Sequence, residues 1–121
     1  MPVMLDIDGV LADFVTGFRL LANTFDSTVR IHGTHEHTSW DFVDINHDVL
    51  VETWKAIDSS YTFWRELRSL LQLKDEIAIN TYDDVIYFAT SRPKGVKVHH
   101  QTNTWLTHQG FMYRGHTLML V

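Results

Sequence analysis

Cysteine is absent from this sequence of 121 residues, and no apolar stretch approaches the length of a membrane-spanning helix. The lack of cysteine excludes disulfide bonds and thiolate metal ligands, and it fits a reducing compartment. The lack of a long apolar run argues against a membrane partner. The first residues also lack the basic lead and the cleavage-site pattern of a signal peptide. We therefore expect a cytoplasmic protein.

Positive charge is also scarce, because 10 lysine and arginine residues stand against 15 aspartate and glutamate residues, for a formal net charge of -5. Binding to a nucleic-acid polymer depends on neutralising many phosphates, so we expect no such partner. One small phosphate bound through a metal ion is compatible with this charge. The hydrophobic fraction of 45% and the charged fraction of 21% are ordinary for a globular domain, alone or with an insertion.

The most informative motif lies in the first dozen residues, where an apolar run ends in two carboxylates and a glycine. Val3 to Ile7 has the composition of a buried parallel strand. Alternate side chains of a strand point to the same face, so Asp6 and Asp8 should lie together at its end. Gly9 allows the backbone to turn sharply beside a ligand. Like charges this close repel unless a cation offsets them, which favours a bound divalent metal.

Apolar spacing and turn residues predict the remaining elements. We expect a helix over 14–25, an irregular excursion over 26–44, a helix from an N-cap at Asn46 to about residue 57, a short helical piece over 63–73, a helix over 74–82, a buried strand over 84–90, a helix over 96–108 and a strand from 116. Strands alternating with helices indicate an α/β protein with a parallel sheet. Its ligand crevice should lie at the carboxyl ends of the strands, where Asp6, Asp8, Thr90 and Ser91 converge.

Both strand-end motifs, Asp6-Ile-Asp-Gly-Val-Leu11 and Thr90-Ser-Arg-Pro93, resemble those of the haloacid dehalogenase superfamily of aspartate-nucleophile phosphohydrolases. The resemblance implies a Rossmann-like three-layer core with a parallel sheet, formed by residues 1–13 and 82–121. It also implies a small helical cap, residues 14–81, inserted after the first strand.

Within that superfamily, three segments look similar to the 5'(3')-deoxyribonucleotidase-like group, including its bacterial and phage members. The segments are Asp8-Gly-Val-Leu-Ala-Asp-Phe14, Trp40-Asp-Phe42 and Phe63-Trp-Arg-Glu-Leu67.

For the first motif, the resemblance implies that Asp6 attacks phosphorus and forms an aspartyl-phosphate. Asp8 would protonate the leaving alcohol and later take a proton from the attacking water. A carboxylate oxygen of Asp6 and the backbone carbonyl of Asp8 would bind Mg²⁺, which offsets charge on the phosphate.

For the second motif, the resemblance implies that Thr90 donates a hydrogen bond to a phosphate oxygen. The backbone amides of Ile7, Gly9 and Ser91 would assist it. Arg92 would add positive charge or a contact with the substrate.

Two further motifs of the superfamily, a lysine and an acidic pair, normally lie near or beyond a third strand. Here that strand ends the sequence at Val121, and Lys94 and Lys97 come too early to supply the lysine. We expect a truncated piece of a longer enzyme, because an apolar last strand leaves a parallel sheet poorly covered. The alternatives are that another chain supplies the groups, as in a homo-oligomer, or that the protein is not an active phosphatase.

Several residues have more than one interpretation. Asp13 either stabilises the start of the first helix, which we favour, or lines the substrate pocket. Thr90 and Ser91 either bind phosphate, which we favour for Thr90, or satisfy a turn.

The remaining candidates are histidines and aromatic residues. His32, His35 and His37 lack the spacing of a zinc site, so a solvated loop is the preferred interpretation. Four aromatic residues are interpreted first as cap core and second as a wall for a nucleobase: Trp40, Phe42, Phe63 and Trp64.

The leading functional hypothesis is a Mg²⁺-dependent phosphomonoesterase that acts on nucleoside monophosphates or another small phosphate ester. Its first rival is a truncated or non-catalytic module that binds a phosphate or a partner protein in the same crevice. A third hypothesis is a phosphotransferase or nucleic-acid end phosphatase, although the acidic charge balance argues against a polymer substrate.

Overall fold

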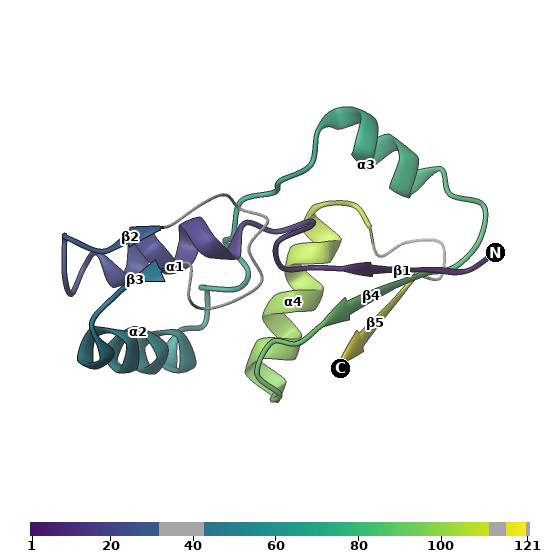
Figure 1. Ribbon diagram of the computed structural model, residues 1–121. Coiled ribbons are helices and arrows are strands. Elements are labelled where there is room, and N and C mark those ends of the chain that lie inside the picture. The colour runs from purple at the N-terminus through teal and green to yellow at the C-terminus, as the bar shows by residue number, and fades with distance from the viewer. Residues whose placement is uncertain (32–42, 112–115, 121) are drawn as a thin grey trace.

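The computed structural model describes residues 1–31, 43–111 and 116–120 and shows a mixed α/β fold (Figure 1). Its elements in chain order are β1 (Val3–Asp6), α1 (Phe14–Ala22), β2 (Arg30–Ile31), β3 (Val43–Asp44), α2 (His47–Ser59), α3 (Leu73–Asn80), β4 (Ile86–Thr90), α4 (Val96–His108) and β5 (Thr117–Leu120). None of the helices in these ranges is long and apolar enough to cross a membrane.

The sheet contains three parallel strands in the order β1-β4-β5. Leu5 of β1 pairs with Phe88 of β4, and Phe88 pairs in turn with Leu118 of β5. The central strand β4 is mostly buried, as its nearly continuous apolar sequence predicts. Parallel pairing places the carboxyl ends of all three strands at one edge of the sheet, which confirms the predicted parallel arrangement.

Side-chain caps define the first two helices. The Asn46 carboxamide oxygen accepts a hydrogen bond from the Asp48 N–H at 2.8 Å, which confirms Asn46 as the N-cap of α2. The helix α1 ends at Ala22, three positions earlier than predicted. There the Thr24 hydroxyl donates to the Leu21 carbonyl at 2.6 Å, and this local bond competes with a further helical turn.

The segment predicted as a helical piece over 63–73 is not a helix, which corrects that prediction. One turn forms at its start, where the Glu66 N–H donates to the Thr62 carbonyl at 3.0 Å, and beyond this turn the main chain pairs with distant residues. The Leu70 N–H donates to the Leu11 carbonyl, and the Arg68 carbonyl accepts from the Asp13 N–H, both at 2.8 Å. These bonds require an extended backbone at residues that the leucine spacing alone assigns to a helix.

The excursion predicted over 26–44 also contains regular structure. Arg30 and Ile31 of β2 pair in antiparallel fashion with Asp44 and Val43 of β3. Two residues are too few to show an alternating pattern, so the sequence did not predict this pair. Residues 32–42, which include His32, His35, His37, Trp40 and Phe42, lie outside the described part of the chain.

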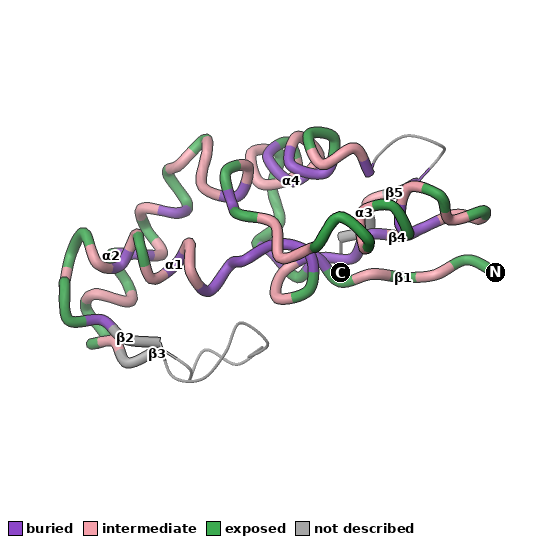
Figure 2. Tube along the Cα trace, turned by 90° about the horizontal axis from the view of Figure 1, so that it is seen from above, coloured by how far each residue is buried: buried purple, intermediate pink, exposed green. Residues whose placement is uncertain are grey.

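Aromatic side chains form the core in two groups. One group lies among α1, α2 and the segment that follows α2, and consists of Phe14, Phe18, Trp54, Phe63 and Trp64. The other joins α4 to the sheet, because the ring of Phe111 lies 6.0 Å from Phe88 and 6.5 Å from Trp105. Buried stretches therefore continue from the start of α1 through β4 to α4 (Figure 2).

One face of α4 binds the last two residues of α2 and the stretch that follows them, here together called the docked segment (residues 58–67). Lys97, Gln101 and Trp105 lie four residues apart, so they share one side of the helix. The Lys97 ammonium donates to the Asp58 carbonyl at 3.0 Å, and the Trp105 indole donates to the Leu67 carbonyl at 2.6 Å. Side chains of α4 therefore bind the main chain of the docked segment.

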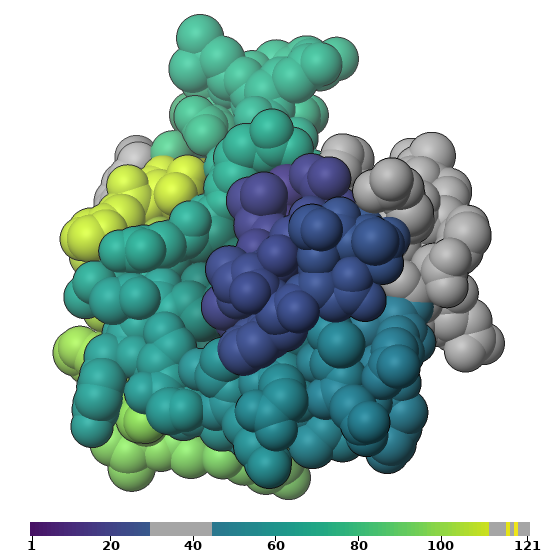
Figure 3. Space-filling view, turned by 90° about the vertical axis from the view of Figure 1, so that its left-hand side faces the viewer, coloured from purple at the N-terminus to yellow at the C-terminus, as the bar shows by residue number. Residues whose placement is uncertain are grey.

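At the opposite end of the molecule from the N-terminus, α1 lies against α2 and the docked segment (Figure 3). A hollow of about 350 Å³ opens there, lined by Gly17, Leu21, Ala56, Ser60, Thr62, Phe63, Glu66 and Leu67. None of the residues predicted to carry chemistry at the strand ends belongs to this lining.

Candidate active site

The two strand-end motifs lie beside each other at the carboxyl edge of the sheet. Asp6 ends β1 and pairs with Ala89 of β4, and the Ile7 N–H donates to the Ala89 carbonyl at 3.0 Å. This register brings Asp6 next to Thr90, the last residue of β4. The predicted approach of the two motifs is therefore present in the structure.

Asp8 is bound by Arg92 through two parallel hydrogen bonds. The Arg92 Nε donates to one carboxylate oxygen at 2.9 Å, and Nη2 donates to the other at 2.8 Å. The Arg92 side chain is fully buried, whereas the Asp8 side chain keeps 24% of its exposure. Paired N–H donors on both oxygens are the strongest and most directional form of this interaction.

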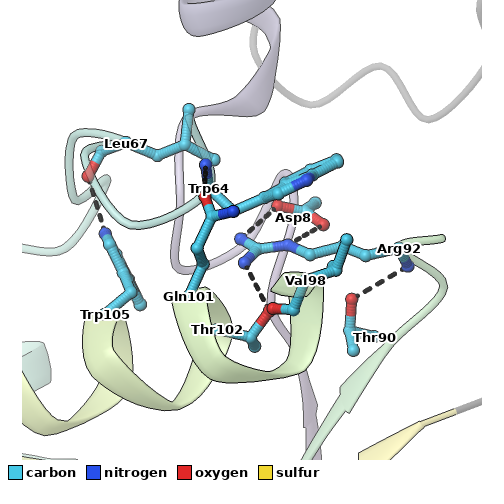
Figure 4. A network of polar contacts seen from close by, with 9 residues as sticks. All are labelled: Asp8, Trp64, Leu67, Thr90, Arg92, Val98, Gln101, Thr102 and Trp105. Atoms are coloured by element: carbon cyan, nitrogen blue, oxygen red, sulfur yellow. Dashed lines mark hydrogen bonds and ion pairs between the residues drawn. The ribbon is translucent and has the colours of Figure 1, made fainter. Parts of the chain in front are cut away.

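Arg92 also contacts two residues outside the strand-end motifs (Figure 4). Its Nη1 donates to the Thr102 hydroxyl of α4 at 3.0 Å. The guanidinium carbon lies 4.7 Å from the centre of the Trp64 ring, a cation–π contact with the docked segment. Sequence reasoning missed Thr102 as part of this site, because the buried side of α4 carries two polar residues, Gln101 and Thr102, and no local pattern sets Thr102 apart.

Thr90 adopts the turn interpretation that the sequence left open. Its hydroxyl oxygen accepts a hydrogen bond from the Arg92 backbone N–H at 3.0 Å, and the residue is buried. The acceptor role leaves the hydroxyl hydrogen for a second bond. Ser91 is exposed beside it.

Asp6 is in a different environment from Asp8. The residue is exposed, and its carboxylate forms no ion pair with a residue in the described ranges. Partial desolvation raises the pKa of Asp6 above its ordinary value, and the neighbouring charge of Asp8 acts in the same direction. The Ile7 N–H and Arg92 oppose this rise. The two carboxylates thus differ in hydration and in partners.

The backbone amides of the first motif are already bonded within the chain. The Gly9 N–H donates to the Ala12 carbonyl at 3.0 Å, as the Ile7 N–H does to Ala89. Gly9 has a φ of 82°, which favours glycine over other residues. The resemblance implied that both amides bind phosphate, and in this arrangement neither is directed to a ligand.

The oxygen donors at this edge suit a Mg²⁺ ion that keeps several of its water ligands. The Asp6 carboxylate is available, and no hydrogen bond within the described residues uses the Asp8 carbonyl. Mg²⁺ is usually bound by one or two carboxylates together with substrate phosphates and water. The described residues contain no group of three or more histidine or acidic side chains arranged to hold a metal.

Other predicted candidates have structural roles. Asp13 is the N-cap of α1, where it accepts from the Thr16 N–H at 3.1 Å and pairs with Arg68 at 2.6 Å. Trp64 belongs to the core, because its ring is stacked on Phe14 at 5.4 Å and is only 2% exposed. That placement leaves no face of Trp64 for a nucleobase.

Comparisons with known proteins add no family assignment: no model of a protein family matches the chain, and no curated protein matches it significantly.

Proposed function

We propose that this chain is a Mg²⁺-dependent phosphomonoester hydrolase of the haloacid dehalogenase superfamily, similar to the 5'(3')-deoxyribonucleotidase-like group. Its substrate would be a nucleoside monophosphate or another small phosphate ester. The observation that carries the proposal is the pair of unlike carboxylates at the strand edge: Asp6 forms no ion pair with a described residue, whereas Asp8 is bound by Arg92. Carboxylates in contrasting environments are suited to different roles in one reaction.

The fold proposal is a three-layer Rossmann-like core, residues 1–13 and 82–121, with a helical cap, residues 14–81. The parallel pairing of β1 with β4 across this intervening segment supports it. The inserted residues contain α1, α2 and α3 together with the two-residue strands β2 and β3, a mostly helical composition that suits a cap.

In the proposed reaction, an Asp6 carboxylate oxygen forms a bond to phosphorus while the bond from phosphorus to the ester oxygen breaks. Asp8 gives a proton to the departing alcohol and later accepts one from the water that hydrolyses the aspartyl-phosphate. Each Asp8 oxygen accepts one hydrogen bond from Arg92 and keeps a second lone pair, on which it can carry the proton. Thr90 would donate its hydroxyl hydrogen to a phosphate oxygen.

A bound Mg²⁺ would supply charge neutralisation at the phosphate. The Asp6 carboxylate and the Asp8 carbonyl are the groups that would hold it.

The test is phosphate release from a panel of nucleoside monophosphates and small phosphate esters, in Mg²⁺ and in EDTA. We expect release in Mg²⁺ only, and a fall of at least about 1,000-fold in Asp6→Asn, because the nucleophile is lost. Asp83→Asn is the matched control, since Asp83 is an exposed aspartate outside the site. No release from any substrate, with Asp6→Asn indistinguishable from the parent protein, would refute the proposal.

A second candidate function is phosphate binding without hydrolysis. It is favoured by the occupied groups of the first motif, namely the Asp8 oxygens and the amides of Ile7 and Gly9. Calorimetric titration with inorganic phosphate and nucleoside monophosphates distinguishes the two functions. Binding that persists in Asp6→Asn, with no turnover by either protein, would support the second.

A further inference from the structure

The fully buried guanidinium of Arg92 is bonded on three sides. Two of its N–H groups go to Asp8, one goes to Thr102, and the Trp64 ring covers a face. A buried cation is stable only when it is paired and hydrogen-bonded in this way. The sequence suggested positive charge or a substrate contact for this arginine, whereas its side chain is fully buried in the structure.

The Thr102 hydroxyl oxygen, which accepts the hydrogen bond from Arg92, is held in one orientation. The Thr102 hydroxyl donates its own hydrogen to the Val98 carbonyl at 2.8 Å, one turn earlier in α4. Its lone pairs are therefore left to accept from Arg92 Nη1. The planar guanidinium cannot rotate without losing this bond, so the helix fixes the plane in which Nε and Nη2 meet Asp8.

The aromatic cover is fixed by the same helix. The Gln101 side-chain oxygen accepts from the Trp64 backbone N–H at 2.9 Å, and Gln101 precedes Thr102 in the chain. Two adjacent residues of α4 thus surround Arg92: Thr102 binds its guanidinium directly, and Gln101 holds the Trp64 ring over it (Figure 4). The Trp64 ring also excludes water from the guanidinium, which strengthens its electrostatic attraction to Asp8.

We propose that Arg92 is the positioning residue of Asp8, which orients this carboxylate at the strand edge without touching the substrate. The inference rests on the proposed function for its kinetic consequences, and on the bonds above for its structural ones. A substrate-binding arginine would chiefly affect KM, whereas a positioning arginine affects the proton transfers assigned to Asp8 and hence kcat.

The kinetic test compares Arg92→Lys and Arg92→Ala with the parent protein at a temperature where all remain folded. We expect kcat to fall about 100-fold in Arg92→Ala, as for a misplaced acid–base group, while KM changes less than about threefold. Arg92→Lys should be intermediate, because an ammonium cannot form the paired bonds. Guanidinium ion at millimolar concentration should restore part of the kcat of Arg92→Ala.

Thr102→Val supplies a second variant with little change in volume. It removes the acceptor of Nη1 and leaves the Arg92–Asp8 bonds in place, so we expect a smaller fall in kcat, about 5- to 10-fold. Arg68→Gln is the matched control, since Arg68 is a partly exposed arginine that pairs with Asp13 outside the site. Its kcat and KM should equal those of the parent.

A readout independent of activity is the NMR resonance of the Arg92 Nε–H. We expect a slowly exchanging signal that shifts in Asp8→Asn and Thr102→Val, and stays in place in Asp6→Asn. If the signal responds as expected but no phosphate is released, the proposed function fails and the positioning of Asp8 stands. A signal unchanged in Asp8→Asn, or a KM rise without a kcat loss in Arg92→Ala, would overturn the inference.

Discussion

The side chain of Gln101 binds the main chain of Trp64 across 37 positions of sequence. Its oxygen accepts the Trp64 N–H at 2.9 Å, and its nitrogen donates to the Ser60 carbonyl, also at 2.9 Å. Gln101 is only 1% exposed, so a single buried amide satisfies two main-chain groups, the buried Trp64 N–H and the carbonyl of the half-buried Ser60. This residue joins α4 to the docked segment.

Replacing Gln101 by leucine should destabilise the protein by about 1 to 3 kcal/mol, chiefly because the Trp64 N–H loses its partner while buried. Urea unfolding followed by tryptophan fluorescence measures this free energy. Gln109→Leu provides the control, since Gln109 is less buried and caps α4 through its backbone. Equal stability of the two variants would show that the Gln101 bonds contribute nothing.

The Asp13 cap should contribute more stability than its ion pair with Arg68. The Asp13 side chain is fully buried, whereas the Arg68 side chain is 67% exposed and its charge is screened by water. We expect Asp13→Ala to cost about 1 to 2 kcal/mol and Arg68→Ala less than about 1 kcal/mol. Asp13→Ser should recover most of the loss, since serine also caps helices. Thermal unfolding of the three variants checks this order.

Asp6 should make stability depend on pH in an unusual direction. Its pKa is raised above the ordinary 3.8, chiefly by desolvation, so ionisation of Asp6 disfavours the folded state. This loss of folding stability is absent at a pH below the ordinary pKa of Asp6 and complete at a pH above its raised pKa in the folded protein. In EDTA at pH 7, Asp6→Asn should therefore have a higher Tm than the parent, and the difference should vanish as the pH falls below 3.8.

Asp26 provides the control of opposite sign. Hydrogen bonds from the Thr28 hydroxyl and N–H lower the pKa of Asp26, so its ionised form favours folding. Asp26→Asn should lower the Tm at pH 7, and this loss should disappear as the pH falls through the depressed pKa. A pH-independent Tm difference for Asp6→Asn would contradict the desolvation account.

His116 should stabilise the sheet through its ring nitrogen Nδ1. The ring nitrogen Nδ1 accepts a hydrogen bond from the Ile86 N–H at 3.2 Å, and the residue is buried beside Phe88. His116→Leu should cost about 1 to 3 kcal/mol, because the Ile86 N–H loses its acceptor. His116→Asn should cost less, since its side-chain oxygen can take the place of Nδ1. The exposed His100 is the control, and its change to leucine should stay within about 0.5 kcal/mol in denaturant unfolding.

Local signals predicted most of the elements. The apolar runs ending at Asp6 and Thr90 identified β1 and β4, and the Asn46 cap located the start of α2. The segment over 63–73 was mispredicted as a helix because its backbone bonds lead to α4 side chains and to the main chain of Leu11 and Asp13, which no local pattern encodes.

The candidate site was predictable in position more than in detail. Asp6 and Thr90 each end a strand of a parallel sheet, and the carboxyl ends of such strands lie at one edge, so their proximity could be expected. The pairing of Arg92 with Asp8 joins residues 84 positions apart. Its partner Thr102 became recognisable only when α4 was placed, because a threonine within a helix usually bonds its own preceding turn.

The contacts between α4 and the docked segment have one further consequence. Every hydrogen bond from Lys97, Gln101 and Trp105 to that segment ends on a backbone atom. Substitutions at the exposed side chains of residues 58–67 would thus leave these bonds unchanged, whereas substitutions on the helix face would break them. In evolution, the exposed side chains of the docked segment could therefore change while its backbone stays bound to α4. The bonding face of α4 could change far less.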